Sequence, residues 1–218
     1  MQNIILIGSG GCMRELLWQI GELNAEKPTW NVIGYVDRRP FASGKAFDLS
    51  VGGIDCPYLG DDEYLLARQK ETNVAVSVGE PILRKKIVEK LSRNPRLRFP
   101  NLIMGDTKLC TDIKMGQGCI ISMGCHISTN VTLGDFVFLN LNSLICHDGV
   151  LGDYTTLSPD VTAAGQVMIG SRCDVGLGTR IIQGITIGDD VIVGAGSVIV
   201  KDVGAECTIA GVPAKRIK

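Results

Sequence analysis

A strict period of six residues runs through the second half of this 218-residue chain and constrains its fold more than any other feature. Counting from residue 103, every sixth position is apolar, and a glycine follows that position in seven of the seventeen hexads. The apolar positions are Ile103, Leu109, Met115, Ile121, Ile127, Leu133, Leu139, Ile145, Leu151, Leu157, Ala163, Ile169, Val175, Ile181, Ile187, Val193 and Ile199. A helix repeats every ~3.6 residues and an ordinary strand about every two, so neither fits. The period predicts a parallel β-helix, in which each hexad forms one short strand and one corner.

The predicted β-helix is a triangular prism, in which three hexads close one coil of eighteen residues. The seventeen hexads then make slightly fewer than six coils. We expect the large apolar residue of each hexad to point into the prism and the glycine after it to relieve the turn. An ordinary β-sandwich is the alternative fold, but it would show alternation and irregular loops, which this sequence lacks.

Residues 1–100 follow a different pattern, in which strand and helix signals alternate. The run from Ile4 to Ile7 is continuously apolar, which is typical of a strand buried on both faces. Strands are predicted over 4–7, 32–36 and 74–78, and helices over 12–23, 61–68 and 81–91. This alternation predicts a Rossmann-like α/β domain over residues 1–100. An all-β parallel β-helix with a short C-terminal tail is predicted over residues 101–218.

Charge and composition argue against several classes of protein. The chain carries 22 Lys and Arg against 23 Asp and Glu, which provides no basic footprint for nucleic acid and no polybasic face for a membrane. No apolar run reaches membrane-spanning length and no basic leader precedes the apolar start, so we expect a cytoplasmic protein. The eight cysteines form no CxxC pair, and we expect them to be reduced and mostly buried. Two histidines are too few for most histidine-built metal sites, so no metal is predicted.

His147 is the leading candidate for a general base, because the chain has only two histidines and Asp148 directly follows this one. His147 comes two residues after the inward-pointing Ile145 and should project outward, where an acidic neighbour can orient the imidazole. On these residues alone, an exposed histidine beside a turn aspartate is the simpler interpretation. His126 has no acidic neighbour and is interpreted as a surface or interface residue. Cys146 should point away from His147, because adjacent strand residues face opposite sides, so no Cys–His nucleophile is predicted.

Coil arithmetic places Gly165 beside His147, because it lies eighteen residues further on and therefore one coil along the same face. Gly165 belongs to the only hexad whose inward residue, Ala163, is small. A bare backbone at this point would let a substrate approach closely. Relief of a tight corner is the alternative explanation for both small residues.

A glycine-rich loop, Gly8-Ser9-Gly10-Gly11, lies between the first predicted strand and the first predicted helix. Backbone N–H groups and a helix terminus in such a loop can hold phosphate. Met13 occupies the place of the third glycine of the dinucleotide fingerprint, which argues against a nicotinamide dehydrogenase. A purely structural strand–helix turn remains an alternative for so short a motif.

Several motifs together carry a resemblance to a known family. The segments Val193–Asp202 and Gly211–Lys215 are similar to the C-terminal signature of the left-handed β-helix (hexapeptide-repeat) acyltransferases. The loop Gly8–Gly11 and the segments Gly34–Asp37 and Cys146–Asp153 narrow this resemblance. The chain resembles, over nearly its whole length, the sialic acid O-acetyltransferase / nucleotide-amino-sugar N-acetyltransferase family of the NeuD/PglD type.

The resemblance implies that acetyl-CoA is the donor and that a nucleotide-linked amino-sugar attacks it directly in a ternary complex. It implies His147 as the catalytic base, Asp148 as its helper carboxylate and the amide of Gly165 as a contact of the acetyl carbonyl. The other implied contacts of acetyl-CoA are Thr156, Lys201, Gly211, Pro213, Ala214 and Lys215. The implied contacts of the acceptor are Gly8, Ser9, Gly10, Gly11, Asp37, Gly79 and Asn140. The family also implies a homotrimer with active sites between adjacent prisms.

Two departures from the family pattern affect these assignments. Thr156 stands where many relatives carry a second histidine, and a hydroxyl cannot act as a base near neutral pH. Cys12 and Met13 replace the more usual small or basic residues of the glycine-rich loop.

The alternative functions are an O-acetyltransferase acting on sialic acid or a related sugar hydroxyl, and a non-catalytic β-helix scaffold. A zinc enzyme of the carbonic anhydrase type is disfavoured, because it would need three histidine ligands.

Overall fold

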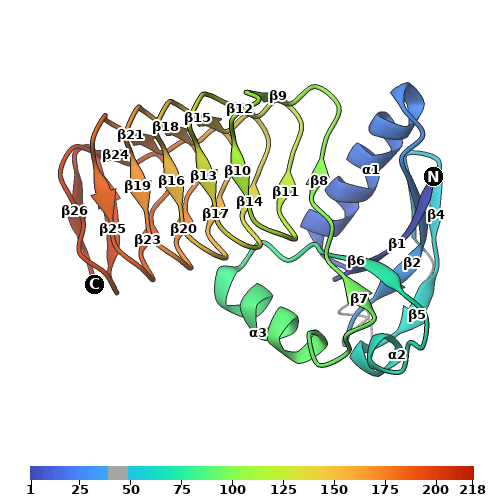
Figure 1. Cartoon of the computed structure of the whole chain (residues 1–218). Helices are drawn as coiled ribbons and strands as arrows, with labels where there is room; N and C mark the ends of the chain where they lie inside the picture. Colours follow the sequence, from blue (N-terminus) through green and yellow to red (C-terminus); the bar gives the residue numbers. More distant parts are fainter. Residues whose placement is uncertain (39–48) are drawn as a thin grey trace. The chain divides into compact units, whose positions relative to one another are not determined.

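The computed structural model describes residues 1–38 and 49–218, which form two compact units. The first unit comprises residues 1–79 and 83–105, and the second comprises residues 80–82 and 106–218. Figure 1 shows that the first is an α/β unit and that the second is a stack of coils built from short strands. The predicted fold class is therefore confirmed.

The first unit is built on a parallel five-stranded sheet in the order β5-β2-β1-β6-β7. Its strands are β1 (Gln2–Ile7), β2 (Trp30–Val36), β5 (Tyr58–Gly60), β6 (Thr72–Val76) and β7 (Leu97–Arg98). The helices of this part of the chain are α1 (Gly11–Glu26), α2 (Asp62–Leu66) and α3 (Pro81–Leu91). A hairpin of β3 (Leu49–Val51) and β4 (Ile54–Cys56) lies outside the sheet. The strand order reverses between β1 and β6, and sheets of this kind bind ligands outside the carboxyl ends of the strands at such a point.

The sequence predicts most elements of this unit but not all of their ends. Ile4, Ile5 and Leu6 are fully buried in β1, as the continuous apolar run predicts. The helix predicted over 81–91 is confirmed, whereas α1 extends to Glu26 and α2 already ends at Leu66. The β3–β4 hairpin has no counterpart in the sequence-based prediction, because strands of three residues are too short to show a period.

The second unit is a left-handed parallel β-helix, in which β9 to β23 make five coils of three strands each. The strand β8 (Leu102–Ile103) still belongs to the first unit. The strands of the second unit are β9 (Lys108–Leu109), β10 (Lys114–Met115), β11 (Ile120–Ile121), β12 (His126–Ile127), β13 (Thr132–Leu133), β14 (Phe138–Leu139), β15 (Leu144–Ile145), β16 (Val150–Leu151), β17 (Thr156–Leu157), β18 (Thr162–Ala163), β19 (Met168–Ile169), β20 (Asp174–Val175), β21 (Arg180–Ile181), β22 (Thr186–Ile187), β23 (Ile192–Val193), β24 (Val198–Ile199), β25 (Thr208–Gly211) and β26 (Ala214–Arg216). Each strand from β9 to β21 pairs in parallel with the strand one coil further on, for example Ile127 with Ile145. Residues eighteen apart therefore stack in columns along the prism. The tail β25–β26 is an antiparallel hairpin.

The core of the prism is the apolar series itself. From Ile121 to Ile199, every residue of the series is at most 3% exposed. Leu109 and Met115 are partly buried against this core. The prediction that the inward series begins at Ile103 is wrong, because Leu102 and Met104 on either side of it are the buried residues and Ile103 itself is 37% exposed. The inward series begins at Leu109.

The glycines after the inward residues serve the stacking of the coils rather than the turn. A Cβ at Gly152 would lie 2.5 Å from the backbone nitrogen of Ser171 in the next coil, and Gly152 has no positive φ. The turn is made two residues further along the hexad, where Asn130 and Asp148 have φ values of 54° and 59°. The expectation that these glycines relieve the turn is therefore wrong, because close approach of neighbouring coils is what requires them.

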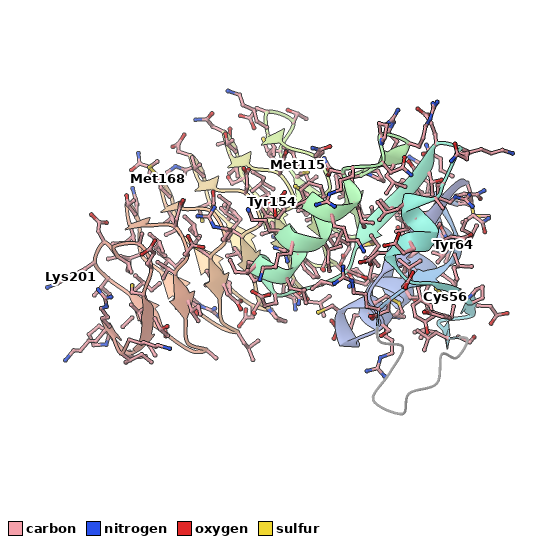
Figure 2. The ribbon with its side chains drawn as sticks, turned by 90° about the horizontal axis from the view of Figure 1, so that it is seen from below. Cys56, Tyr64, Met115, Tyr154, Met168 and Lys201 are labelled. Atoms are coloured by element: carbon pink, nitrogen blue, oxygen red, sulfur yellow. The ribbon has the colours of Figure 1, made fainter. Side chains whose placement is uncertain are left out.

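Truncation of a core residue tests the inward register. Leu139 is fully buried, so Leu139→Ala should lower the free energy of unfolding by roughly 2–5 kcal/mol through lost burial and a residual cavity. Met168 occupies the outward position of β19, is 50% exposed and projects from the prism (Figure 2), so Met168→Ala is the matched control and should change stability by less than about 0.5 kcal/mol. Urea unfolding followed by circular dichroism measures both variants. Equal stabilities for the two variants would contradict this register.

The eight cysteines are all free thiols, and five of them are buried. Burial raises the pKa of Cys56 and of Cys125 to about 12, so these two thiols stay protonated near neutral pH. The prediction that the cysteines are mostly small buried hydrophobic residues is confirmed, with Cys110 as the exposed exception.

Candidate active site

His147 lies at a corner of the prism, between β15 and β16. Asp148 makes the turn with its left-handed backbone, and this conformation brings the two side chains together. His147 Nδ1 lies 2.8 Å from Asp148 Oδ2, and the two side chains are 48% and 42% exposed. The pair is thus accessible to a substrate, as a general base must be.

The charge of Asp148 is stabilised by hydrogen bonds. Asn130 Nδ2 donates to Asp148 Oδ1 at 2.7 Å, and this bond, followed by the one to His147, holds the pKa of Asp148 below its usual value. The ionised carboxylate only accepts hydrogen bonds, so Nδ1 carries the imidazole proton and Nε2 is left as the basic nitrogen. Because the folded-state pKa is lowered, this arrangement is complete above the ordinary pKa of an aspartate and is lost as the pH falls through the folded-state value.

Gly165 lies directly against the His147 ring, as the coil arithmetic predicts. A Cβ at Gly165 would lie 2.4 Å from His147 Nε2 and 2.5 Å from Cε1, so only glycine fits beneath this imidazole. In the described part of the chain, the N–H of Gly165 has no hydrogen-bond acceptor. At the equivalent position of another corner, the N–H of Ser171 donates a hydrogen bond to Asp189 Oδ1 at 2.8 Å. Gly165 therefore presents a free backbone donor next to the basic nitrogen of His147.

The column that contains His147 and Gly165 continues toward the C-terminus through Gln183 and Lys201. We call these four residues the His147 column. Ile182 and Val200, one position earlier in their hexads, are 46% and 39% exposed, so apolar surface runs beside the column. Figure 2 shows Lys201 near the C-terminal end of the coils, with its side chain pointing outward.

The other residues expected to contact acetyl-CoA lie on a different sheet. Gly211, Pro213, Ala214 and Lys215 belong to the β25–β26 hairpin and its turn, which extend the sheet of β17, β20 and β23. Lys215 is exposed, whereas Ala214 packs partly against the prism core. Gly211 has a φ of 105°, which only glycine adopts readily, and its N–H donates to Ser197 Oγ at 3.2 Å.

One chain does not bring Asn140 or Thr156 to His147. Thr156 begins β17 and Asn140 directly follows β14 of the same sheet, whereas His147 follows β15 of another sheet. Thr156 is only 5% exposed. The Oδ1 of Asn140 accepts the N–H of Leu141 at 2.8 Å, which is the geometry of a local corner bond.

A cavity of about 590 Å³ lies over the outer face of β9, β12 and β15. His126 and Cys146 line it, together with Cys110 and Lys108, but His147 does not. Cys146 and His147 therefore face different surroundings, as expected from the alternation of strand residues. Among the residues that the structure describes, the corner of His147 and Gly165 pairs an imidazole with a free backbone donor, and it is therefore the candidate site.

The first unit carries a second cavity, of about 450 Å³, outside the carboxyl ends of its strands. Of the predicted acceptor contacts, Gly8 and Asp37 line it, and Ser9 Oγ donates to Asp37 Oδ2 at 2.6 Å. Gly8 has a φ of 108°, so the turn itself requires glycine. Gly10 caps α1 without a side-chain hydrogen bond, which leaves the N–H groups of the first turn for a ligand.

The same cavity is lined by charged residues that the sequence did not indicate. Arg38 and Lys86 bring positive charge, and Asp62, which is 5% exposed, accepts from Arg38 Nε at 2.5 Å. Leu83, Lys86 and Ile87 share one face of α3. Their spacing of three and four residues is the feature of the sequence that could have indicated this shared face. Gly79 does not line the cavity, although a Cβ there would come within 3.3 Å of Cys12 Sγ.

Comparisons with known proteins agree with both units. A family model described as the PglD N-terminal domain matches residues 3–91, and one described as the hexapeptide repeat of succinyl-transferase matches residues 166–201. GDP-perosamine N-acetyltransferase of Escherichia coli O157:H7 is 32% identical over 160 residues, which are 69% of each protein. The structure of PerB from Caulobacter crescentus in complex with CoA and GDP-perosamine is 31% identical, with a TM-score of 0.86, and the match covers 100% of this chain and 98% of that one. The acetyltransferase domain of PglB from Neisseria gonorrhoeae FA1090, in complex with acetyl coenzyme A, is 28% identical over 99% of both chains, with a TM-score of 0.86.

The stacked hexads and these matches define the class of the protein, which is a left-handed β-helix acyltransferase. Within this class, the chain belongs to the NeuD/PglD-type family of acetyltransferases, as its motifs predict. Among residues 1–38 and 49–218, no group of three or more His, Cys, Asp or Glu could hold a metal ion. The helices of those residues lack the length and apolar character that a membrane span requires.

Proposed function

We propose that the acceptor of this acetyltransferase is a GDP-linked amino-sugar and that His147 is its general base. The protein transfers the acetyl group of acetyl-CoA to the amino group of a nucleotide-linked amino-sugar, as the sequence predicts. The choice of GDP is supported by the Escherichia coli and Caulobacter crescentus relatives, both of which are named for GDP-perosamine or contain it. The observation that carries the role of His147 is the contact of its basic nitrogen with the free backbone of Gly165.

In the proposed reaction, a bond forms between the acceptor nitrogen and the acetyl carbon, and the bond from that carbon to sulfur breaks. His147 Nε2 takes the proton that the attacking amine loses and later returns it to the departing thiolate. Asp148 stabilises the imidazolium that exists between these two events. The N–H of Gly165 donates to the carbonyl oxygen as negative charge develops on it. No acyl-enzyme forms, so neither Cys146 nor any other thiol has a role.

The His147 column and the apolar surface beside it offer the kinds of group that bind acetyl-CoA. Gly165 offers the donor for the thioester, and the exposed Ile182 and Val200 offer apolar surface for the pantetheine arm. Lys201 offers positive charge for a phosphate. The exposed turn at Pro213 and the Lys215 side chain provide further contacts at the C-terminal end of the prism. Acetyl-CoA and nucleotide-linked sugars are cytoplasmic metabolites, so we propose the cytoplasm as the location of the reaction.

The cavity of the first unit is the proposed site of the nucleotide. Its position at the strand-order reversal is where such sheets hold ligands. Lys86 offers a positive charge for a diphosphate, with Arg38 beside it in an ion pair with Asp62, and the open start of α1, with the loop Gly8–Gly11, adds backbone donors. Asp37, whose carboxylate accepts a hydrogen bond from Ser9, is the proposed acceptor for a hydroxyl of the ribose or an N–H of the base.

The proposed active assembly is a homotrimer. The separation of Asn140 and Thr156 from His147 within one chain supports it, because a neighbouring prism can supply what one chain lacks. Mixing His147→Ala chains with Asn140→Ala chains after mild dissociation tests this idea. Recovery of activity above that of either inactive variant is expected for shared sites, whereas no recovery would indicate that each chain acts alone.

A thiol-release assay tests the acceptor. Acetyl-CoA is offered with GDP-, UDP- and dTDP-linked amino-sugars and with sialic acid, and the product is identified by mass spectrometry. Thiol release with a GDP-linked amino-sugar and an N-acetylated product is the expected result. Release with UDP- or dTDP-linked amino-sugars alone would contradict the choice of nucleotide. Release with sialic acid alone would favour O-acetylation, and no release together with no binding of acetyl-CoA would favour a scaffold.

A further inference from the structure

Asn130 lies one coil before Asp148, and the two residues occupy the same corner position with φ values of 54° and 59°. Asn130 Nδ2 donates to Asp148 Oδ1, while Asp148 Oδ2 is the oxygen that faces His147 Nδ1. The two oxygens of the Asp148 carboxylate thus have different partners, the amide of Asn130 and the imidazole of His147. We propose that Asn130 is a positioning residue for the general base, because it holds Asp148 in the rotamer that orients His147. This inference rests on the proposed role of His147.

Asn130 is itself fixed from the preceding coil. Its backbone N–H donates to Asp112 Oδ2 at 3.0 Å, and the hydroxyl of Thr129 donates to the same oxygen at 2.6 Å. These bonds hold the pKa of Asp112 below its usual value, with the Thr129 hydroxyl as the largest cause. A chain of hydrogen bonds therefore runs along one edge of the prism over three coils, from Asp112 through Asn130 and Asp148 to His147.

An asparagine suits this position for a chemical reason. Its amide donates a hydrogen bond without bringing a positive charge, and a cation so close to the imidazole would weaken His147 as a base. The Asp148 side chain is 42% exposed, so without a partner its carboxylate would rotate freely into solvent. The left-handed backbone at this corner is also one that asparagine tolerates better than most residues.

A second corner of the same prism provides a matched control. Asn142 has a φ of 58°, and Asp160 follows it by one coil, so the pair repeats the spacing of Asn130 and Asp148. Asp160 is engaged by Arg180, whose NH2 group donates to Oδ2 at 2.9 Å, and no histidine adjoins it. Replacement of Asn142 should therefore remove an asparagine from the same kind of corner without affecting His147.

The experiment compares Asn130→Gly with Asn142→Gly. Glycine keeps the left-handed corner without strain, so both variants should fold, which thermal unfolding checks. Asn130→Gly should lower kcat by about ten-fold through misorientation of the base, with the KM for acetyl-CoA within about two-fold of wild type. In ¹⁵N NMR of labelled histidine, His147 should change from the Nδ1–H tautomer to a mixture, whereas His126 should not change. Asn142→Gly should match wild type in all of these measurements.

The two readouts separate the possible failures. A kcat within about two-fold of wild type, or an unchanged His147 tautomer, in Asn130→Gly overturns the positioning role. The same effects in Asn142→Gly also overturn it, because they would show a general loss of corner structure. The tautomer reports on Asn130 even if no acceptor is acetylated, so failure of the proposed function remains distinguishable from failure of this inference.

Discussion

His147→Ala is expected to lower kcat by roughly 10²–10⁴-fold, which is the usual contribution of a positioned general base. The KM for acetyl-CoA should change little, because the imidazole acts on the proton of the acceptor rather than on the body of the donor. Stability should be unaffected, since the His147 side chain is 48% exposed. Steady-state thiol release at saturating acceptor measures the effect.

His126→Ala is the control for this result, because the chain has two histidines and His126 is exposed on β12 without a carboxylate partner in the sequence. It should retain the wild-type rate. If His147→Ala also kept its rate within about two-fold, the assignment of the base would be wrong.

Gly165→Ala is the second substitution for which a large loss is expected, and its effect separates activity from stability. The three atoms nearest to the added Cβ all belong to the imidazole of His147, at 2.4, 2.5 and 3.1 Å. An exposed side chain can move away, so the fold should survive while the base is displaced and the backbone donor is covered. Loss of an oxyanion donor alone costs roughly 10²–10³-fold in kcat, so a loss of at least that size is expected.

Gly204→Ala is the matched control, because a Cβ at Gly204 would meet nothing within 4 Å and its φ is not positive. Thermal unfolding and thiol release should both be close to wild type for this variant. Gly165→Ala should show the wild-type unfolding temperature but almost no turnover. A fully active Gly165→Ala would show that neither the imidazole position nor the Gly165 N–H matters for the reaction.

The geometry of the prism is predictable from the sequence because the period is rigid. Eighteen residues make one coil, so the distance in sequence from His147 to Gly165 already implies contact in space, and the structure confirms it. The same arithmetic applied backwards from Asp148 leads to Asn130. That contact was not predicted, because asparagine is also an ordinary corner former and nothing in the sequence separates the two roles.

The start of the apolar series and the first unit are the parts of the molecule that the six-residue period does not predict. Ile103 fits the period but not the core, because Leu102 and Met104 are the buried residues of this segment and an apolar residue type alone does not decide which side chain is buried. The charged lining from Arg38 and Lys86 arises where separate elements of the first unit meet, and a local pattern cannot express this. The family resemblance implies roles for Asn140 and Thr156, but only the structure shows that they belong to the strand ends of one sheet and His147 to those of another.

The central claim is that the thioester reacts at the corner formed by His147 and Gly165. A crystal structure of the protein with acetyl-CoA bound tests it most directly. The account predicts the acetyl carbonyl oxygen at about 2.7–3.1 Å from the Gly165 nitrogen, beside His147 Nε2, with the pantetheine arm running along the His147 column toward Lys201. Acetyl-CoA bound with its thioester in the cavity over β9, β12 and β15, or anywhere else away from Gly165, would contradict it.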